Sequence, residues 1–82
     1  MIRRTVRLAI PQGLHARPTS AIAQAMKRFK GRLEIRLGDR KADARSVLEM
    51  MTLAAGEGAE IELVASGEDE ARLIDAVIAL LT

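Results

Sequence analysis

The residues best suited to chemistry in this sequence lie together in one hexapeptide, GLHARP, at residues 13–18. It contains His15, the only histidine of the chain, and a neutral imidazole is a nucleophile near pH 7. Two residues later, the guanidinium of Arg17 is a planar donor that suits phosphate oxygens. If the imidazole accepted a phosphoryl group, Arg17 would be in place to bind its oxygens.

The same hexapeptide marks the start of a helix. Pro18 is tolerated in a first turn, because the first amides of a helix have no partners within it. These free amides and the helix dipole make an anion site, so Ala16, Arg17 and Pro18 form the predicted phosphate-anchoring turn. His15 falls at the N-cap. On the histidine alone, the alternative is that it merely caps the helix while Arg17 is solvated.

The remaining sequence predicts the elements that position this turn. Alternating apolar residues predict strands over 2–10, 33–37, 41–44 and 60–66. Helical periodicity predicts helices over 16–30, 47–53 and 68–81. Ser46 and Glu49 fit a capping box at the second helix, and Gly56 and Gly58 are expected to end it. The order predicts a single α+β domain over 1–82, an open-faced sandwich of a four-stranded antiparallel sheet with three helices on one face.

Composition restricts the class of protein. With 49% apolar and 29% charged residues the chain reads as globular. The absence of cysteine and the single histidine argue against a metal site, and we expect no cofactor. The longest apolar run, residues 76–81, is far shorter than the roughly 20 residues that cross a bilayer. No leader pattern is recognised, so we expect a cytoplasmic protein without membrane insertion.

Charge is unevenly distributed along the sequence. Residues 1–45 hold twelve of the thirteen Lys and Arg and three acids, whereas residues 46–82 hold one Arg and eight acids. This asymmetry predicts a basic surface for an acidic partner, although it can also be incidental. Phe29 is the only aromatic residue, so the chain lacks the stacking platform of single-stranded nucleic-acid readers. We therefore expect no nucleic-acid partner.

The expected second helix is apolar on almost every side. A core this thin cannot bury all faces of it, so some of its apolar side chains should be exposed and available for docking. The alternative is that all of them belong to the core.

The hexapeptide near residue 15 and the order of elements resemble HPr, the histidine-containing phosphocarrier family of the bacterial phosphoenolpyruvate-dependent phosphotransferase system. The resemblance extends to 46–48, 52–58 and 66–70, and 75–81 are similar to the nitrogen-branch relatives of HPr. It implies that phosphorylated enzyme I transfers its phosphoryl group to Nδ1 of His15. His15 then passes the group to a histidine of an enzyme IIA domain, while Arg17 screens the charge. Such a protein is a carrier rather than an enzyme, and we expect a monomer.

The resemblance also implies a partner-docking face. Its positions here are Ala16, Ser20, Gln24, Lys27, Val47, Leu48 and Met51. Ser46 matches the serine that a dedicated kinase phosphorylates in low-GC Gram-positive HPr. Glu49, however, stands where that group usually has glycine, and its charge would oppose a phosphate. We therefore favour an N-cap role for Ser46. A second hypothesis for the whole chain is a regulatory HPr-like protein that binds a transcription factor or an enzyme.

Overall fold

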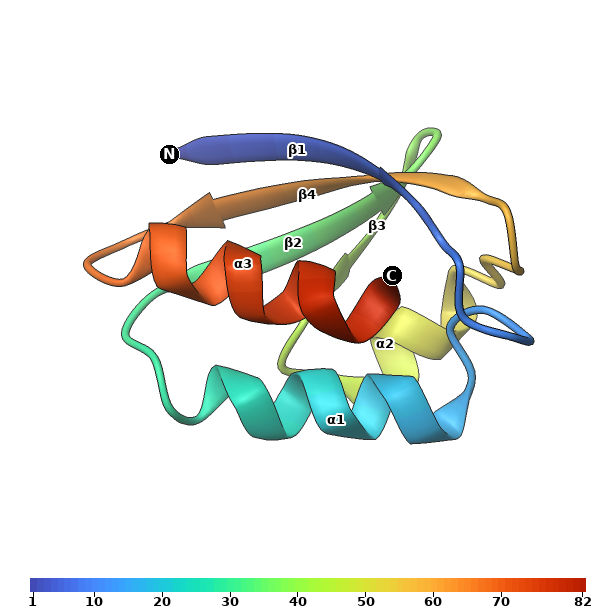
Figure 1. Cartoon of the computed structure of the whole chain (residues 1–82), viewed down its shortest axis with the longest axis horizontal. Coiled ribbons are helices and arrows are strands. Elements are labelled where there is room, and N and C mark those ends of the chain that lie inside the picture. Colours follow the sequence, from blue (N-terminus) through green and yellow to red (C-terminus); the bar gives the residue numbers. More distant parts are fainter.

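The chain alternates strands and helices in the predicted order. The computed structural model describes all of residues 1–82. Its elements are β1 (Ile2–Arg7), α1 (Ala16–Met26), β2 (Arg32–Leu37), β3 (Arg40–Asp43), α2 (Val47–Thr52), β4 (Glu60–Ser66) and α3 (Glu70–Leu81) (Figure 1). The predicted α+β class is confirmed.

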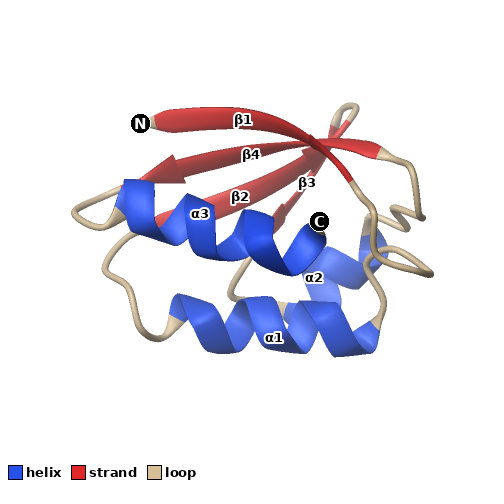
Figure 2. Ribbon diagram, viewed as in Figure 1, coloured by secondary structure: helices blue, strands red, loops and turns tan.

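The four strands form one antiparallel sheet in the order β1-β4-β2-β3. The last strand in the sequence, β4, lies inside the sheet, where Ile61 pairs with Val6 of β1 and Leu63 pairs with Ile35 of β2. The three helices cover one face of the sheet and leave the other open (Figure 2). This confirms the expected open-faced sandwich.

The core fills the space between the sheet and the helices. In β4, Ile61, Leu63 and Ala65 are buried and point toward the helices, because successive side chains of a strand alternate between its faces. Helices α1 and α3 bury stripes three and four residues apart, which include Ile22 and Met26 in α1. The 19 residues of the resulting cluster are contiguous, so the chain has one core.

Two predicted elements are shorter than expected. The strand predicted over 2–10 ends at Arg7, because the N–H of Ala9 turns away to the carbonyl of Leu81 in α3. The helix predicted over 16–30 ends at Met26. Residues 27–29 tighten into turns of i to i−3 bonds, and the Arg45 guanidinium caps this end by donating to the carbonyls of Met26 and Gly31 at 3.4 and 2.9 Å.

Only one of the two hydrogen bonds of the capping box predicted for α2 is present. The side chain of Ser46 accepts a hydrogen bond from the N–H of Glu49 at 3.2 Å, as expected. The return bond is absent, because the N–H of Ser46 donates to the carbonyl of Asp43. The Glu49 carboxylate instead accepts from the N–H of Asp43 at 3.1 Å. Glu49 thus ties the start of α2 to the end of β3.

The end of α2 also differs from the prediction. The helix stops at Thr52, before the expected glycines, and Leu53 caps it. The next residue, Ala54, has a φ of 54°, in the left-handed region that usually holds glycine at a helix C-terminus. Its side chain is exposed. The chain therefore turns here against the conformational preference of an alanine.

We expect Ala54→Gly to raise the free energy of unfolding by about 1 kcal/mol, because a left-handed conformation costs an L-residue roughly that much and glycine much less. Urea denaturation measures this. The control is Ala76→Gly in the middle of α3, which should lower the free energy of unfolding by a similar amount. A loss of stability in Ala54→Gly would contradict the argument.

Candidate functional site

His15 is the N-cap residue of α1, as the sequence predicted. Its backbone is extended, with φ −97° and ψ −172°, and its side chain makes no capping hydrogen bond. His15 therefore holds the N-cap position by its backbone alone, without a capping bond from the imidazole. The side chain is half-buried, so the ring is supported by its surroundings while part of it faces solvent.

A tight loop before α1 sets the position of His15. Gln12 and Gly13 both have a φ of 65°. A Cβ atom on Gly13 would lie 2.1 Å from the carbonyl oxygen of Ala55, so only glycine allows this approach. The N–H of Leu14 donates to that same carbonyl at 2.9 Å, and its side chain is buried in the core. The loop is thus fastened to the connection between α2 and β4.

The first turn of α1 offers an anion site. The backbone N–H groups of Ala16 and Arg17 have no hydrogen-bond partner in the protein. Pro18 has no N–H and contributes its helical φ instead. The turn contains no acidic residue, and the exposed Arg17 makes no ion pair. The dipole and the guanidinium therefore act together, without a compensating carboxylate.

His15 and Arg17 border a shallow surface hollow. Its other lining residues are Ile10, Pro11, Gln12, Pro18 and Ala21. A shallow hollow of this kind has room for a small anion and is open to solvent. The structure contains no cluster of three or more acidic or histidine side chains that could bind a metal ion. None of its helices is both long and apolar enough to cross a membrane.

The residues expected to form the docking face are mostly at the surface. Leu48 is 77% exposed and Met51 is 41% exposed, whereas Met50 of the same helix is fully buried. The prediction that α2 leaves some apolar side chains outside is confirmed, and the alternative of a wholly buried α2 is wrong. Helices α1 and α2 are in contact. The docking face, as used below, consists of Ala16, Ser20, Gln24, Lys27, Val47, Leu48 and Met51; Val47 is half-buried and the rest are exposed.

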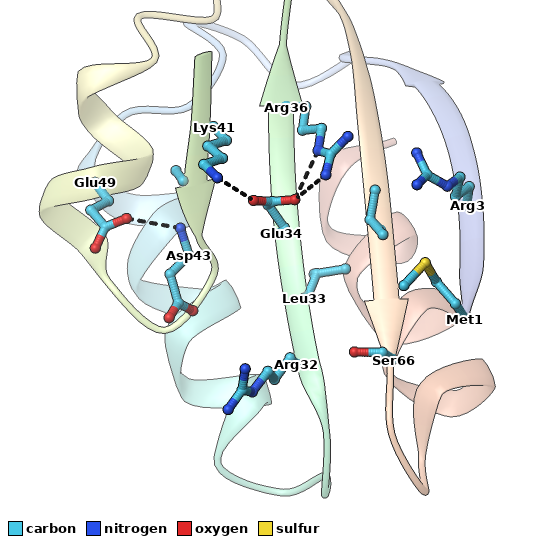
Figure 3. A pocket seen from close by; sticks show the side chains of 12 residues that line it. Met1, Arg3, Arg32, Leu33, Glu34, Arg36, Lys41, Asp43, Glu49 and Ser66 are labelled. Atoms are coloured by element: carbon cyan, nitrogen blue, oxygen red, sulfur yellow. Dashed lines mark hydrogen bonds and ion pairs between the residues drawn. The ribbon is translucent and has the colours of Figure 1, made fainter. Parts of the chain in front are cut away.

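A second hollow, of about 360 Å³, lies among the strands (Figure 3). Some of its charges are paired: the Glu34 carboxylate lies 2.8 Å from the guanidinium of Arg36 and 3.9 Å from the ammonium of Lys41. Across the sheet, Arg3 and Arg36 both pair with Glu62 of β4. Part of the basic charge of the first half of the chain is therefore paired with acids of the second half. The basic surface for an acidic partner stays a prediction.

Two contributors to the site were not recognised in the sequence. One is Ala55, whose backbone carbonyl receives the His15 loop; alanine carries no chemical signal of such a role. The other is Thr19, which is completely buried beneath His15. Its polar side chain on the buried face of a helix was the available signal.

Comparisons with known proteins agree with this geometry. The family model described as "PTS HPr component phosphorylation site" matches residues 2–82. The chain is 38% identical over 77 residues to phosphocarrier protein HPr of Treponema pallidum, covering 94% of this chain and 88% of that protein. It is 33% identical over 81 residues to HPr-like protein Crh of Halalkalibacterium halodurans, covering 99% and 96%. The crystal structure of HPr from Bacillus anthracis matches with a TM-score of 0.93 at 27% identity, covering 99% and 96% of the two chains. The chain therefore belongs to the HPr family of phosphocarrier proteins, which carry a phosphoryl group without catalysing a reaction of their own.

Proposed function

We propose that His15 accepts a phosphoryl group from phosphorylated enzyme I and donates it to a histidine of an enzyme IIA domain. The observation that carries this proposal is the state of the imidazole, which stands at the N-cap of α1 without capping it. Beside it lie the free amides of Ala16 and Arg17 and the unpaired Arg17 guanidinium. The nucleophile and the groups that bind its product are thus in one place.

The transfer exchanges one bond to phosphorus for another. The lone pair of His15 Nδ1 attacks the phosphorus while the bond between phosphorus and the donor breaks, and the donor keeps that electron pair. Charge on the phosphoryl oxygens is then met by the helix dipole, the first-turn amides and Arg17. Each charge-assisted hydrogen bond is worth about 1.5–3 kcal/mol. The second transfer is the same exchange in the opposite sense, with the enzyme IIA histidine as nucleophile.

The docking face explains how different partners reach the same histidine. It places exposed apolar side chains of α2 beside the start of α1, where His15 lies. Leu48 and Met51 supply area that binds without a strict hydrogen-bond pattern, and methionine adapts to different partner surfaces. Lys27, near the end of α1, can steer an acidic partner. Enzyme I and the enzyme IIA domain would then use the same face in turn.

A regulatory role is the second candidate, because one relative of this chain is an HPr-like protein Crh. In that role the same face would bind a transcription factor or an enzyme, and phosphoryl transfer would be secondary. The free imidazole and the unpaired Arg17 favour the carrier role, since a purely regulatory protein needs neither. Residues 75–81 suggest the nitrogen branch, and comparing transfer to enzyme IIA domains of the carbohydrate and nitrogen branches tests that subtype.

Ser46 is proposed to be a structural cap rather than a regulatory phosphorylation site. Its side chain already accepts from the N–H of Glu49. A phosphate on Ser46 would stand within the same turn as the Glu49 carboxylate, and like charges at this separation repel. Glu49 is also bound to the N–H of Asp43, so moving it away would break that hydrogen bond.

Incubation with enzyme I and labelled phosphoenolpyruvate should label this protein with a group that is lost in acid and survives base, as expected of phosphohistidine. His15→Ala should accept no label and remain folded, because the imidazole makes no capping bond. Circular dichroism checks its fold. Equal labelling of this variant would refute the role of His15. No label on the folded wild type with several active enzyme I preparations would favour the regulatory role.

Leu48→Ala should raise the KM for this protein as a substrate of enzyme I about fivefold or more, as truncation of an interface anchor does. Its free energy of unfolding should change by less than about 0.5 kcal/mol, because the side chain is exposed. Met50→Ala is the matched control from the buried side of α2. It should lower the free energy of unfolding by about 2–5 kcal/mol and leave KM nearly unchanged. An unchanged KM in Leu48→Ala would remove Leu48 from the docking face.

Ser46→Ala should lower the free energy of unfolding by about 1 kcal/mol, since it removes the cap of α2. Chemical denaturation measures this loss. In parallel, an HPr serine kinase with ATP should add no phosphate to the wild-type protein, with Ser46→Ala as the blank. Stoichiometric phosphorylation that is absent from this variant would establish the regulatory site instead.

A further inference from the structure

Thr19 is the one polar residue of this protein that is buried, and its exposed fraction is 0%. It lies in the first turns of α1, four residues after His15. Its hydroxyl donates to the carbonyl of His15, with an Oγ1–O distance of 2.8 Å, and shares its proton with the carbonyl of Ala16 at 3.1 Å. The hydroxyl is therefore satisfied, and it acts on the backbone of the phosphoryl acceptor.

These contacts hold His15 by its main chain. Its N–H donates to the carbonyl of Gly13 at 2.9 Å. Its carbonyl accepts from the backbone N–H of Thr19 at 3.2 Å and from the hydroxyl of Thr19 at 2.8 Å. The hydroxyl makes the shorter of the two bonds, whereas the backbone bond is at the long end of the usual range. The hydroxyl is thus the closer of the two donors that orient this carbonyl.

The main chain matters because the ring has no hydrogen bond of its own to the helix. The direction of the Cα–Cβ bond of His15, and with it the placement of the imidazole over the free amides, depends on the backbone angles of the N-cap. A threonine hydroxyl that bonds the carbonyl four residues earlier competes with the backbone and adjusts the local helix geometry. A valine would fill the same volume without that bond, so filling the core does not explain a hydroxyl here.

We propose that Thr19 is a positioning residue for phosphoryl transfer: its buried hydroxyl orients the His15 carbonyl, and through the N-cap backbone the imidazole. The proposal deepens the carrier function and rests on it. It requires no contact between Thr19 and the phosphoryl group. On this proposal, a residue on the buried face of α1 affects phosphoryl transfer at the solvent-facing side of the same helix.

Two substitutions separate the hydroxyl from the methyl group. Thr19→Val keeps the shape and removes the hydroxyl, whereas Thr19→Ser keeps the hydroxyl and removes the methyl. Both are compared with the wild type for kcat and KM of phosphorylation by enzyme I with phosphoenolpyruvate. Thr19→Val should lower kcat about fivefold, the rate equivalent of one hydrogen bond, and leave KM within about twofold because the docking face is untouched. Thr19→Ser should restore kcat.

Stability distinguishes positioning from packing. Thr19→Ser loses buried methyl contacts and should melt below the wild type, and Thr19→Val should melt at or above it. If Thr19 only packs, kcat should follow melting temperature, with Thr19→Ser the slower variant. If Thr19 positions His15, kcat should be low in Thr19→Val, which lacks the hydroxyl, and close to the wild-type value in Thr19→Ser, which keeps it. A kcat for Thr19→Val equal to that of the wild type overturns the proposal and leaves the carrier function intact.

A measurement without any transfer partner separates this proposal from the carrier function. Three-bond couplings in nuclear magnetic resonance spectra report the side-chain torsion of His15 about Cα–Cβ in the unphosphorylated protein. We expect one rotamer in the wild type and in Thr19→Ser, and averaged couplings in Thr19→Val. The same couplings in all three proteins would overturn the proposal. Wild-type protein that takes no label yet shows the expected couplings would refute the carrier function, while the orientation of the His15 ring by Thr19 would stand.

Discussion

The hydrogen bond from the N–H of Leu14 to the carbonyl of Ala55 is the contact on which the position of His15 depends. It joins the loop before α1 to the loop after α2, and the bare Cα of Gly13 lets the two backbones approach this closely. The Leu14 side chain is buried in the core beside this junction, so displacing the loop would also expose apolar surface. A histidine on an exposed loop thereby gains a fixed place relative to the sheet.

Several arginines of the sheet are paired with acids, whereas the arginine beside His15 is not. Arg3 of β1 and Arg36 of β2 both pair with Glu62 of β4, and Arg7 of β1 lies 3.0 Å from Glu60. Exposed pairs of this kind contribute little stability, but they cancel each other's field. The first turn of α1 has no acid, and Arg17 has no partner. Its positive potential is therefore available to a phosphoryl anion.

Local signals predicted the elements, and contacts distant in sequence decided their ends. The order of strands and helices follows from apolar periodicity, and the hexapeptide around His15 predicted the candidate site. The end of α1 could not be read from residues 16–30, because Arg45 caps it from beyond β3. The partner of Glu49 was missed for the same reason, since its bond to Asp43 depends on how α2 meets the sheet. The left-handed backbone conformation of Ala54 could not be predicted, because alanine is not typical of left-handed turns.

A phosphoryl carrier must keep its reacting residue accessible and also hold it in a fixed geometry. In this fold, exposed groups meet the first requirement and buried groups meet the second. The histidine that carries the phosphoryl group must be accessible first to the donor protein and then to the receiving protein. A deep pocket would prevent this, so the histidine also lacks the side-chain contacts that a pocket would give. Precise transfer nevertheless needs a fixed geometry, since small displacements of reacting atoms are costly. In the proposed carrier, the backbone of the N-cap is fixed from the buried side, by hydrogen bonds at Gly13 and Leu14 and by the hydroxyl of Thr19, while the imidazole is half-buried and Arg17 is exposed. Burying the positioning groups and exposing the reacting ones allows one small domain to serve successive partners.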